Sequence, residues 1–229
     1  MPFPGFDRGQ LRFFRQLAAR QDRAWFKEHK DEYVALAEQP MKDLLDALQP
    51  ALARQYKGFV LAPPKHFRIY RDVRFSKDKS PFKTNIAAMI GLRGGEEEGA
   101  PAALYMHLGL NDYAGAGHWM LPPDKLARYR KLVASDQSGR ELQKRVDALR
   151  KKGFKIETFD TTKRVPPGFP PDHPRAELLK KKGLGISFPK FPTAMRFSPK
   201  LASWLAARSG EAASLVTWLE KRLQGKDAR

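Results

Sequence analysis

The apolar residues in the first 64 positions recur with the period of an α-helix. Leu11, Phe14 and Leu17 are spaced three residues apart, and a similar stripe of leucines follows Pro40. Asp22 stands before an aromatic-rich segment, where its carboxylate suits a helix N-cap, and Pro40 suits the first turn of a further helix. We therefore predict three amphipathic helices whose aromatic residues lie mainly in the core.

From about residue 66 the period changes to two. Apolar and polar residues alternate through residues 66–75, which predicts a strand with two unlike faces. Residues 85–92, 103–110 and 113–120 also have the character of strands, and the connections between them are short, including a glycine- and acid-rich loop at 93–101. We expect an antiparallel meander. In its first strand the core-facing row is Phe67, Ile69, Val73 and Phe75, and the polar row is Arg68, Tyr70, Asp72 and Arg74.

The remainder of the chain is predicted to be mainly helical. Helices are expected at 122–133, 139–152, 172–182 and 198–219, the last with a break at Gly210, and a short strand at 154–159. An irregular loop at 164–174 contains five prolines, and Asp172 near its end is expected to cap the next helix. The predicted class is α+β, with N-terminal helices, a central antiparallel meander and C-terminal helices. We expect a single domain over 1–229, with a helical subregion at 1–64, the meander at 65–120 and a mainly helical subregion at 121–229.

Composition excludes some classes of protein. Hydrophobic residues make up 41% of the chain, which is enough for a core. The chain has no cysteine, so disulfides, thiol catalysis and cysteine-bound zinc are excluded. The first residues lack the pattern of a signal peptide, and no run approaches the ~18 apolar residues of a membrane span. We expect a soluble, cytoplasmic protein that is not inserted in a membrane.

The formal net charge is +18, and it is unevenly distributed. Residues 125–229 hold 25 basic and 10 acidic side chains, and residues 65–83 hold 7 and 2. Such a field attracts an anionic small molecule or a nucleic acid, although a basic surface also serves solubility. The basic helices at 124–152 and 172–182 favour nucleic acid, but the sequence contains no recognition helix or RNP motif, and a stacking platform needs several aromatic residues on one face.

A candidate anion site lies in the first predicted strand and the loop after it. Guanidinium and ammonium groups are the usual partners of phosphate and carboxylate oxygens. The site would use Arg68, Arg71, Arg74, Lys79 and Lys83, with Asp72 orienting the arginines. The alternative is a structural network of arginine and aspartate with no ligand. Arg71 falls on the apolar row, so it is either moved into the site by a bulge or buried in an ion pair.

Tyr105 and His107 alternate with apolar neighbours and are expected on the same sheet face as these polar residues. Asn85 would join them, Ala87 and Met89 would form the floor, and Gly115 and Gly117 would give a ligand room to approach. His107, Tyr105 and Asp72 are the candidates for catalysis, although a structural hydrogen bond explains His107 equally well. The histidines have no metal-binding spacing, no particular cofactor is indicated, and whether the protein is an enzyme stays open.

Residues 68–83 also carry a recognisable motif. It consists of Arg68, Arg71, Asp72, Arg74, Phe75, Lys79, Pro81 and Lys83. This spacing resembles the signature of the bacterial and fungal family called domain of unknown function 2461, and the segment at 22–33, Pro40 and the loop at 166–174 are also similar to it. The resemblance implies no established activity. Phe82 stands where the family usually has tyrosine, so we assign this position no role in proton transfer.

Overall fold

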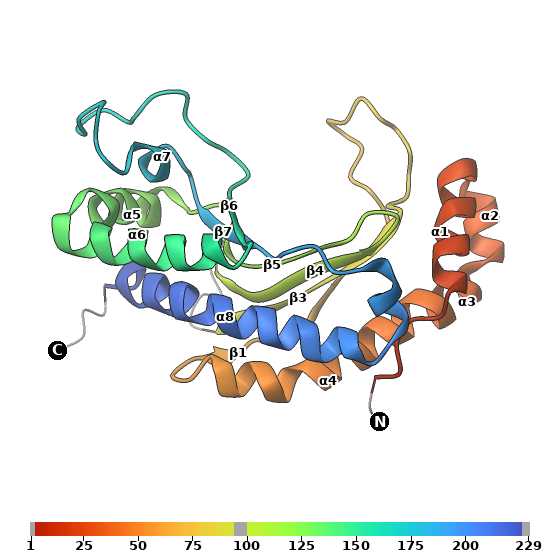
Figure 1. The fold of residues 1–229 in the computed structure, drawn as a ribbon. Coiled ribbons are helices and arrows are strands. Elements are labelled where there is room, and N and C mark those ends of the chain that lie inside the picture. Colours follow the sequence, from red (N-terminus) through yellow and green to blue (C-terminus); the bar gives the residue numbers. More distant parts are fainter. Residues whose placement is uncertain (1–2, 94–99, 226–229) are drawn as a thin grey trace.

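The computed structural model describes residues 3–93 and 100–225. A sheet lies at the centre, with helices against one face and at both ends (Figure 1). About 49% of the residues are helical and 18% are in strands, which confirms the predicted α+β class. The helices are α1 (Gly9–Arg20), α2 (Arg23–Glu28), α3 (Lys30–Tyr33), α4 (Gln39–Gln55), α5 (Pro123–Ala134), α6 (Asp136–Lys151), α7 (Ala176–Leu179) and α8 (Lys200–Leu223). The strands are β1 (Val60–Leu61), β2 (Lys65–Phe67), β3 (Asn85–Arg93), β4 (Ala102–Gly109), β5 (Tyr113–His118), β6 (Lys155–Glu157) and β7 (Leu184–Ser187).

The sheet has the strand order β1-β3-β4-β5-β7-β6, and β2 also pairs with β3. All of these pairs are antiparallel. The predicted meander is confirmed as β3, β4 and β5, and the short strand expected at 154–159 is β6. The loop expected at 93–101 lies largely outside the described residues. Strand β7 was not predicted, because its four residues include a glycine and show no clear alternation of apolar and polar positions.

One face of this sheet is buried. Ile86, Ala88 and Ile90 of β3 and Leu104 and Met106 of β4 point toward α4 and α8, which lie beneath the sheet in Figure 1. The expected break in α8 at Gly210 is wrong, because the helix continues from Lys200 to Leu223. A Cβ atom at Gly210 would lie 2.8 Å from the side chain of Gln55, so this glycine permits close packing of α8 on the end of α4.

The N-terminal helices stand at one end of the sheet (Figure 1). Asp22 is the predicted cap: its carboxylate accepts a hydrogen bond of 2.7 Å from the backbone N–H of Trp25. The expected second helix is interrupted after Glu28, and a π-helical turn at Val34–Glu38 leads into α4. Pro40 lies in the first turn of α4, as predicted.

The strand predicted at 66–75 is wrong beyond Phe67. Residues 68–84 leave the sheet as a raised hairpin, which is the yellow-orange loop of Figure 1, and within it Tyr70 forms a bridge with Phe82. The alternation of apolar and polar residues does not form a strand here, because the apolar row has no surface to pack against at its far end, where Phe75 is 96% exposed. Only Ile69 and Phe82 of the hairpin's apolar residues are buried.

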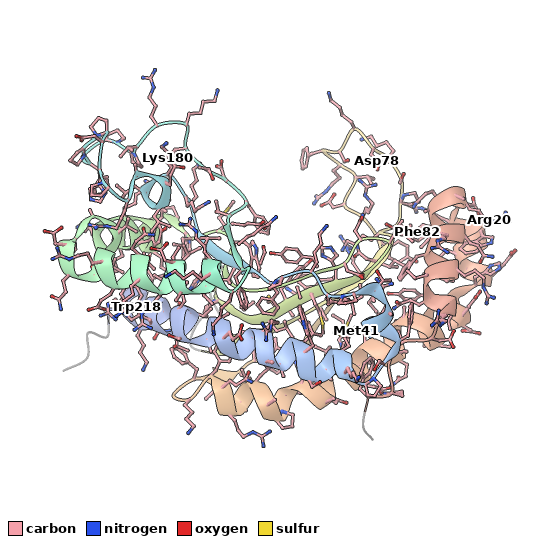
Figure 2. All side chains as sticks on the ribbon, in the orientation of Figure 1. Arg20, Met41, Asp78, Phe82, Lys180 and Trp218 are labelled. Carbon is pink, nitrogen blue, oxygen red and sulfur yellow. The ribbon has the colours of Figure 1, made fainter. Side chains whose placement is uncertain are left out.

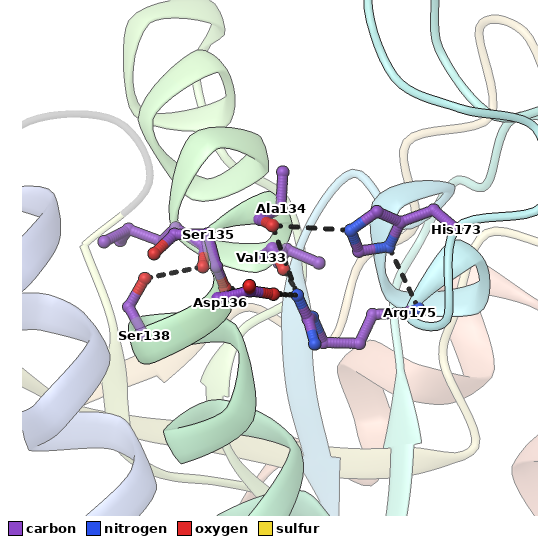
Figure 3. Close-up of polar contacts among 8 residues, drawn as sticks. Val133, Ala134, Ser135, Asp136, Ser138, His173 and Arg175 are labelled. Atoms are coloured by element: carbon purple, nitrogen blue, oxygen red, sulfur yellow. Dashed lines mark hydrogen bonds and ion pairs between the residues drawn. The ribbon is translucent and has the colours of Figure 1, made fainter.

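A second raised segment follows β6 and includes the proline-rich loop and α7. The expected cap at Asp172 is wrong, and the helix expected at 172–182 is limited to Ala176–Leu179. Arg175 instead attaches this segment to the end of α5, where its guanidinium donates to the carbonyls of Val133, Ala134 and Ser135 (Figure 3). This attachment fixes the segment beside the uncovered face of the sheet.

Candidate functional site

The uncovered face of the sheet carries an aromatic cleft. The register places Phe67 opposite Ala87, Met89 opposite Tyr105, and His107 opposite Tyr113, so these residues share one face across four strands. The cleft has a volume of about 520 Å³. Its lining residues are Phe67, Met89, Tyr105, His107, Tyr113, Trp119, Glu157, Thr158 and Phe159. The prediction that Tyr105 and His107 share a face is therefore confirmed, but the residue of the first strand on that face is Phe67, which was expected to face the core.

The indole of Trp119 packs against the backbone at two glycines, Gly185 and Gly115. A Cβ atom at Gly185 would lie 2.7 Å from the indole, and one at Gly115 would lie 2.9 Å from it. The room that Gly115 was expected to leave for a ligand is thus filled by Trp119. Gly117 has φ +100°, which favours glycine, and a Cβ atom there would lie 2.6 Å from the carbonyl oxygen of Leu184.

Tyr105 and His107 form a pair in the floor of the cleft. The Tyr105 hydroxyl is 3.3 Å from His107 Nδ1, and the His107 ring stacks on Tyr113 with centroids 5.4 Å apart. Burial lowers the pKa of His107 below its usual value, against a smaller opposing effect of the Asp112 charge. Burial also raises the pKa of Tyr105. A neutral imidazole and a neutral phenol therefore face the cleft near pH 7.

A chain of hydrogen bonds runs along one end of the cleft. Trp119 Nε1 donates to the Tyr113 hydroxyl at 3.0 Å, which lies 2.6 Å from Ser187 Oγ, and Ser187 donates to Glu157 Oε2 at 2.5 Å. Burial raises the pKa of Tyr113, and the hydrogen bonds with Ser187 and Trp119 oppose this increase. The chain links β5, β6 and β7 and gives this end of the cleft a fixed polar surface.

The arginines of the motif do not converge on one pocket. Arg71 is half-buried and forms an ion pair with Asp78, which is the second of the two alternatives for this residue. Arg74 forms two hydrogen bonds with Asp72, at 3.0 and 2.7 Å. Lys79 donates to the carbonyl oxygen of Val73 at 3.0 Å. These contacts hold the hairpin together, as the structural alternative requires.

The acidic partners in the hairpin are held ionised. Hydrogen bonds from Arg74 lower the pKa of Asp72 to about 2. Hydrogen bonds from Arg71 and Ser80 hold the pKa of Asp78 well below its usual range. Because both carboxylates are exposed, solvent screens these pairs and their contribution to stability is local.

Three other basic residues lie around Phe67, which lines both the cleft and a neighbouring pocket, and we call Lys65, Arg68 and Lys83 the basic rim. The ammonium of Lys65 is 5.5 Å from the centroid of Phe67, and that of Lys83 is 6.0 Å from it. Lys83 donates to the carbonyl oxygen of Arg68 at 2.9 Å. Within the described residues, the Arg68 guanidinium has neither a hydrogen bond nor an ion pair. Its side chain lines a neighbouring pocket of about 360 Å³ together with Lys30 and Tyr33.

The hairpin is docked on the N-terminal helices through Phe82. Its ring packs on Phe26 with centroids 4.6 Å apart, and its backbone N–H donates to Gln21 Oε1 at 3.0 Å. Figure 2 shows Phe82 at the base of the hairpin and Asp78 near its tip. Phe82 is thus a structural anchor that sets the position of Lys83, the next residue along the chain.

A family model matches residues 10–218, which is most of the chain. The chain belongs to the DUF2461 family of conserved hypothetical proteins. No curated protein and no solved structure is significantly similar to it. None of the helices that the structure describes is long and apolar enough to cross a membrane.

In this DUF2461 protein, several residues of the cleft were not predicted from sequence. Trp119 was placed in a strand without a role, and Glu157, Ser187 and Phe159 come from segments that were not connected with the sheet face. The glycines around Trp119 were the one available signal, and they indicate a close approach. Among residues 3–93 and 100–225, no group of three or more histidine or acidic side chains is arranged to hold a metal ion.

Proposed function

We propose that the protein binds a small anionic ligand with a planar ring in the aromatic cleft. The observation that carries this proposal is the gathering of aromatic side chains from β2, β4 and β5 in one cleft whose edge carries the basic rim. Flat rings pack favourably on aromatic side chains, and ammonium and guanidinium groups bind phosphate or carboxylate. Both halves of the ligand therefore have a complementary surface.

Electrostatics at the basic rim supports an anionic ligand. Burial lowers the pKa of Lys83, and the nearby charge of Arg68 lowers it further. The two cations repel each other in the free protein, and an anion bound beside them removes that cost. Lys83 uses one of its three N–H donors on the Arg68 carbonyl, so two are left for the ligand.

In this proposal the basic residues of the motif have two different roles, anion binding and stabilisation of the hairpin. Arg68 and Lys83 bind the anion, joined by Lys65. Arg71, Arg74 and Lys79, with Asp72 and Asp78, hold the hairpin that positions Lys83. Tyr105 and His107 contact the ring, and they are the groups that would exchange a proton with it if the protein is an enzyme.

Binding of dissected probes tests the proposal. Adenosine 5′-monophosphate carries both ring and anion, adenosine carries only the ring, and ribose 5-phosphate carries only the anion. We expect calorimetry and tryptophan fluorescence to show the highest affinity for the complete nucleotide, and 4-aminobenzoate serves as the carboxylate probe. If none of the complete probes binds, the proposal is wrong.

Matched variants locate the site. Phe159, which is 77% exposed, lines the cleft, whereas Phe75 is exposed at the hairpin, away from the cleft lining. Phe159→Ala should weaken binding and Phe75→Ala should not. Lys65→Met should weaken binding of the anion, with Lys77→Met as its control. Equal effects of the members of each pair would place binding elsewhere.

Single-stranded nucleic acid is the second candidate. The sequence suggested no platform with several aromatic residues on one face, but the cleft provides one, and the raised segments on both sides carry basic residues. These include Arg74, Lys77 and Lys79 in the hairpin and Lys163, Arg164 and Lys181 in the segment after β6. This candidate predicts that an oligonucleotide binds much more tightly than the mononucleotide and that its affinity falls steeply with salt.

A further inference from the structure

The hydrogen bonds at the Glu157 end of the cleft all run in one direction. An indole N–H only donates, and an ionised carboxylate only accepts. Since the single proton of Ser187 goes to Glu157, the proton between Tyr113 and Ser187 belongs to Tyr113. The order is therefore Trp119 to Tyr113 to Ser187 to Glu157, with each group donating to the next.

Thr158 follows the same rule. Its hydroxyl donates to the backbone carbonyl of Trp119 at 2.8 Å and so points its proton into the protein. Trp119, Tyr113 and Thr158 all line the cleft, and each has its side-chain proton engaged. Tyr113, Thr158 and Glu157 therefore present oxygen lone pairs to the cleft.

The sheet holds this arrangement in place. Gly115 of β5 pairs with Ser187 of β7, and Glu157 of β6 pairs with Gly185, so the partners come from three adjacent strands. The Trp119 ring is confined by the backbone of Gly185. Acceptors fixed in this way discriminate strongly, because a ligand without a matching donor leaves them unpaired.

We propose that the Glu157 end of the cleft selects ligands whose ring carries an N–H or amino group. This inference rests on the proposed function, and it narrows the ligand to an aminated planar ring that bears a phosphate or carboxylate. The donor would lie at Tyr113 and Glu157, and the anion at the basic rim. Three strand spacings separate β2 from Tyr113 in β5, about 14 Å on a flat sheet, and the Glu157 carboxylate reaches from β6 to the Ser187 hydroxyl beside Tyr113. A single ring with an extended anionic group fits that span.

The charges at the two ends fix the orientation of the ligand. Glu157 supplies a negative charge at one end, and Lys65 and Lys83 supply positive charges at the other. A ligand bound the other way would place its anion against a carboxylate and its donor against ammonium groups. Like-charge contacts of this kind are strongly unfavourable, so only one orientation is compatible with the cleft.

The test compares two probes that differ only in the amino group. Adenosine 5′-monophosphate has a 6-amino group, and purine riboside 5′-monophosphate has hydrogen at that position. For the wild-type protein we expect roughly ten-fold tighter binding of the aminated probe, the usual effect of a hydrogen bond to a charged acceptor. The fragment pair 4-aminophenyl phosphate and phenyl phosphate should show the same preference.

Two variants tie the preference to the hydrogen-bond chain. Ser187→Ala removes the acceptor of the Tyr113 proton, which is then free to turn into the cleft, so the preference for the aminated probe should shrink or reverse. Tyr113→Phe removes the oxygen and should reduce the preference, and it keeps the test decisive if Ser187→Ala does not fold. Ser138→Ala, which removes a hydroxyl bound to Leu132 outside the cleft, is the matched control.

The outcomes separate the two proposals. If both members of each probe pair bind equally and Phe159→Ala weakens both, the ligand site stands and the donor selection is overturned. If the preference for the aminated probe exists but survives both Ser187→Ala and Tyr113→Phe, the hydrogen-bond chain from Trp119 to Glu157 is not its cause and that assignment is overturned. If no probe binds the wild-type protein, the proposed function fails and the inference fails with it.

Discussion

The indole ring of Trp119 lies on the backbone of Gly185, at a point where a Cβ atom would be 2.7 Å from the ring. This contact brings Trp119 Nε1 to 3.0 Å from the Tyr113 hydroxyl. The polar end of the cleft therefore depends on a glycine in β7, a strand that comes late in the sequence. Backbone geometry and hydrogen bonding are coupled here through a single aromatic ring.

Replacing Gly185 should disturb both the packing of the Trp119 ring and its hydrogen bond to Tyr113. We expect Gly185→Ala to push the Trp119 ring off the sheet, break its bond to Tyr113 and lower the free energy of unfolding by roughly 1–3 kcal/mol, the usual cost of overpacking. Urea unfolding would measure the change in stability, and a shift in the tryptophan emission relative to the wild type would report the movement of the ring. Gly91→Ala is the control, since a Cβ atom there makes only ordinary contacts at 3.7 and 3.8 Å. Equal stability of the two variants would show that the ring adapts without cost.

The ion pair of Arg71 and Asp78 should keep the hairpin closed. We expect Arg71→Met and Asp78→Asn each to increase the rate of chymotrypsin cleavage after the exposed Phe75. The double variant should be cleaved no faster than the single ones, because each removes the same pair. Lys77→Met is the control. Additive effects of the two substitutions would mean that Arg71 and Asp78 act separately.

Acid should open the same hairpin. The pKa values of Asp72 and Asp78 are lower in the folded chain than the usual 3.8, so their contribution is present at neutral pH and is lost as the pH falls through the folded values. The backbone N–H groups of Arg74 and Ser80 donate to these carboxylates and report on them. We expect their NMR chemical shifts to titrate with midpoints well below 3.8, at about 2 for Asp72. Midpoints near 3.8 would show that the pairs do not form in solution.

His107 should make stability depend on pH near neutrality. Its folded pKa lies below 6.5, so the unfolded chain binds more protons between the two values, and stability falls as the pH drops below about 6.5. We expect His107→Gln to reduce the difference between urea midpoints at pH 7.5 and pH 5. A residual difference should remain, since burial also lowers the pKa of His66. An NMR titration of His107 with a midpoint above 6.5 would contradict this account.

The sequence predicted those parts of the fold in which a local pattern and a core-facing row coincide. Tyr105 and His107 were placed on one face because alternation in β4 is enforced by Leu104 and Met106 on the buried side. The row that begins at Phe67 alternates equally well as far as Phe75, but no strand pairs with residues 73–75 and Phe75 is exposed, so the strand predicted there is wrong.

The polar half of the cleft could not be predicted from local sequence patterns. The hydrogen bond between Tyr113 and Ser187 joins residues 74 positions apart, and that between Ser187 and Glu157 joins residues 30 apart. None of these three residues belongs to a sequence motif, and only the pairing of β5, β7 and β6 brings them together. The charged motif drew attention to the hairpin, whereas the chemistry of the cleft comes mainly from aromatic residues that resemble ordinary core residues in sequence.

Arg175 provides a test of how the second raised segment is held. It is 8% exposed, and its guanidinium donates to three carbonyls at the end of α5, at 2.6, 3.2 and 3.1 Å (Figure 3). Arg175→Met would leave the carbonyl of Val133 unpaired and partly buried, whereas the carbonyl of Ser135 keeps the backbone N–H of Gly139 at 2.9 Å and that of Ala134 keeps a contact of 3.4 Å with His173 Nε2. We expect the free energy of unfolding to fall by roughly 1–3 kcal/mol.

Arg175→Lys should recover only part of this loss, because an ammonium lacks the planar fork that reaches several acceptors at once. Arg164→Met, which changes an exposed arginine of the same segment, should be close to neutral. Thermal unfolding would rank the variants. Because the segment also carries Phe159, Arg175→Met should in addition weaken binding of adenosine 5′-monophosphate at a temperature where the variant is folded. Wild-type stability in Arg175→Met would show that water replaces the guanidinium at the end of α5 without loss.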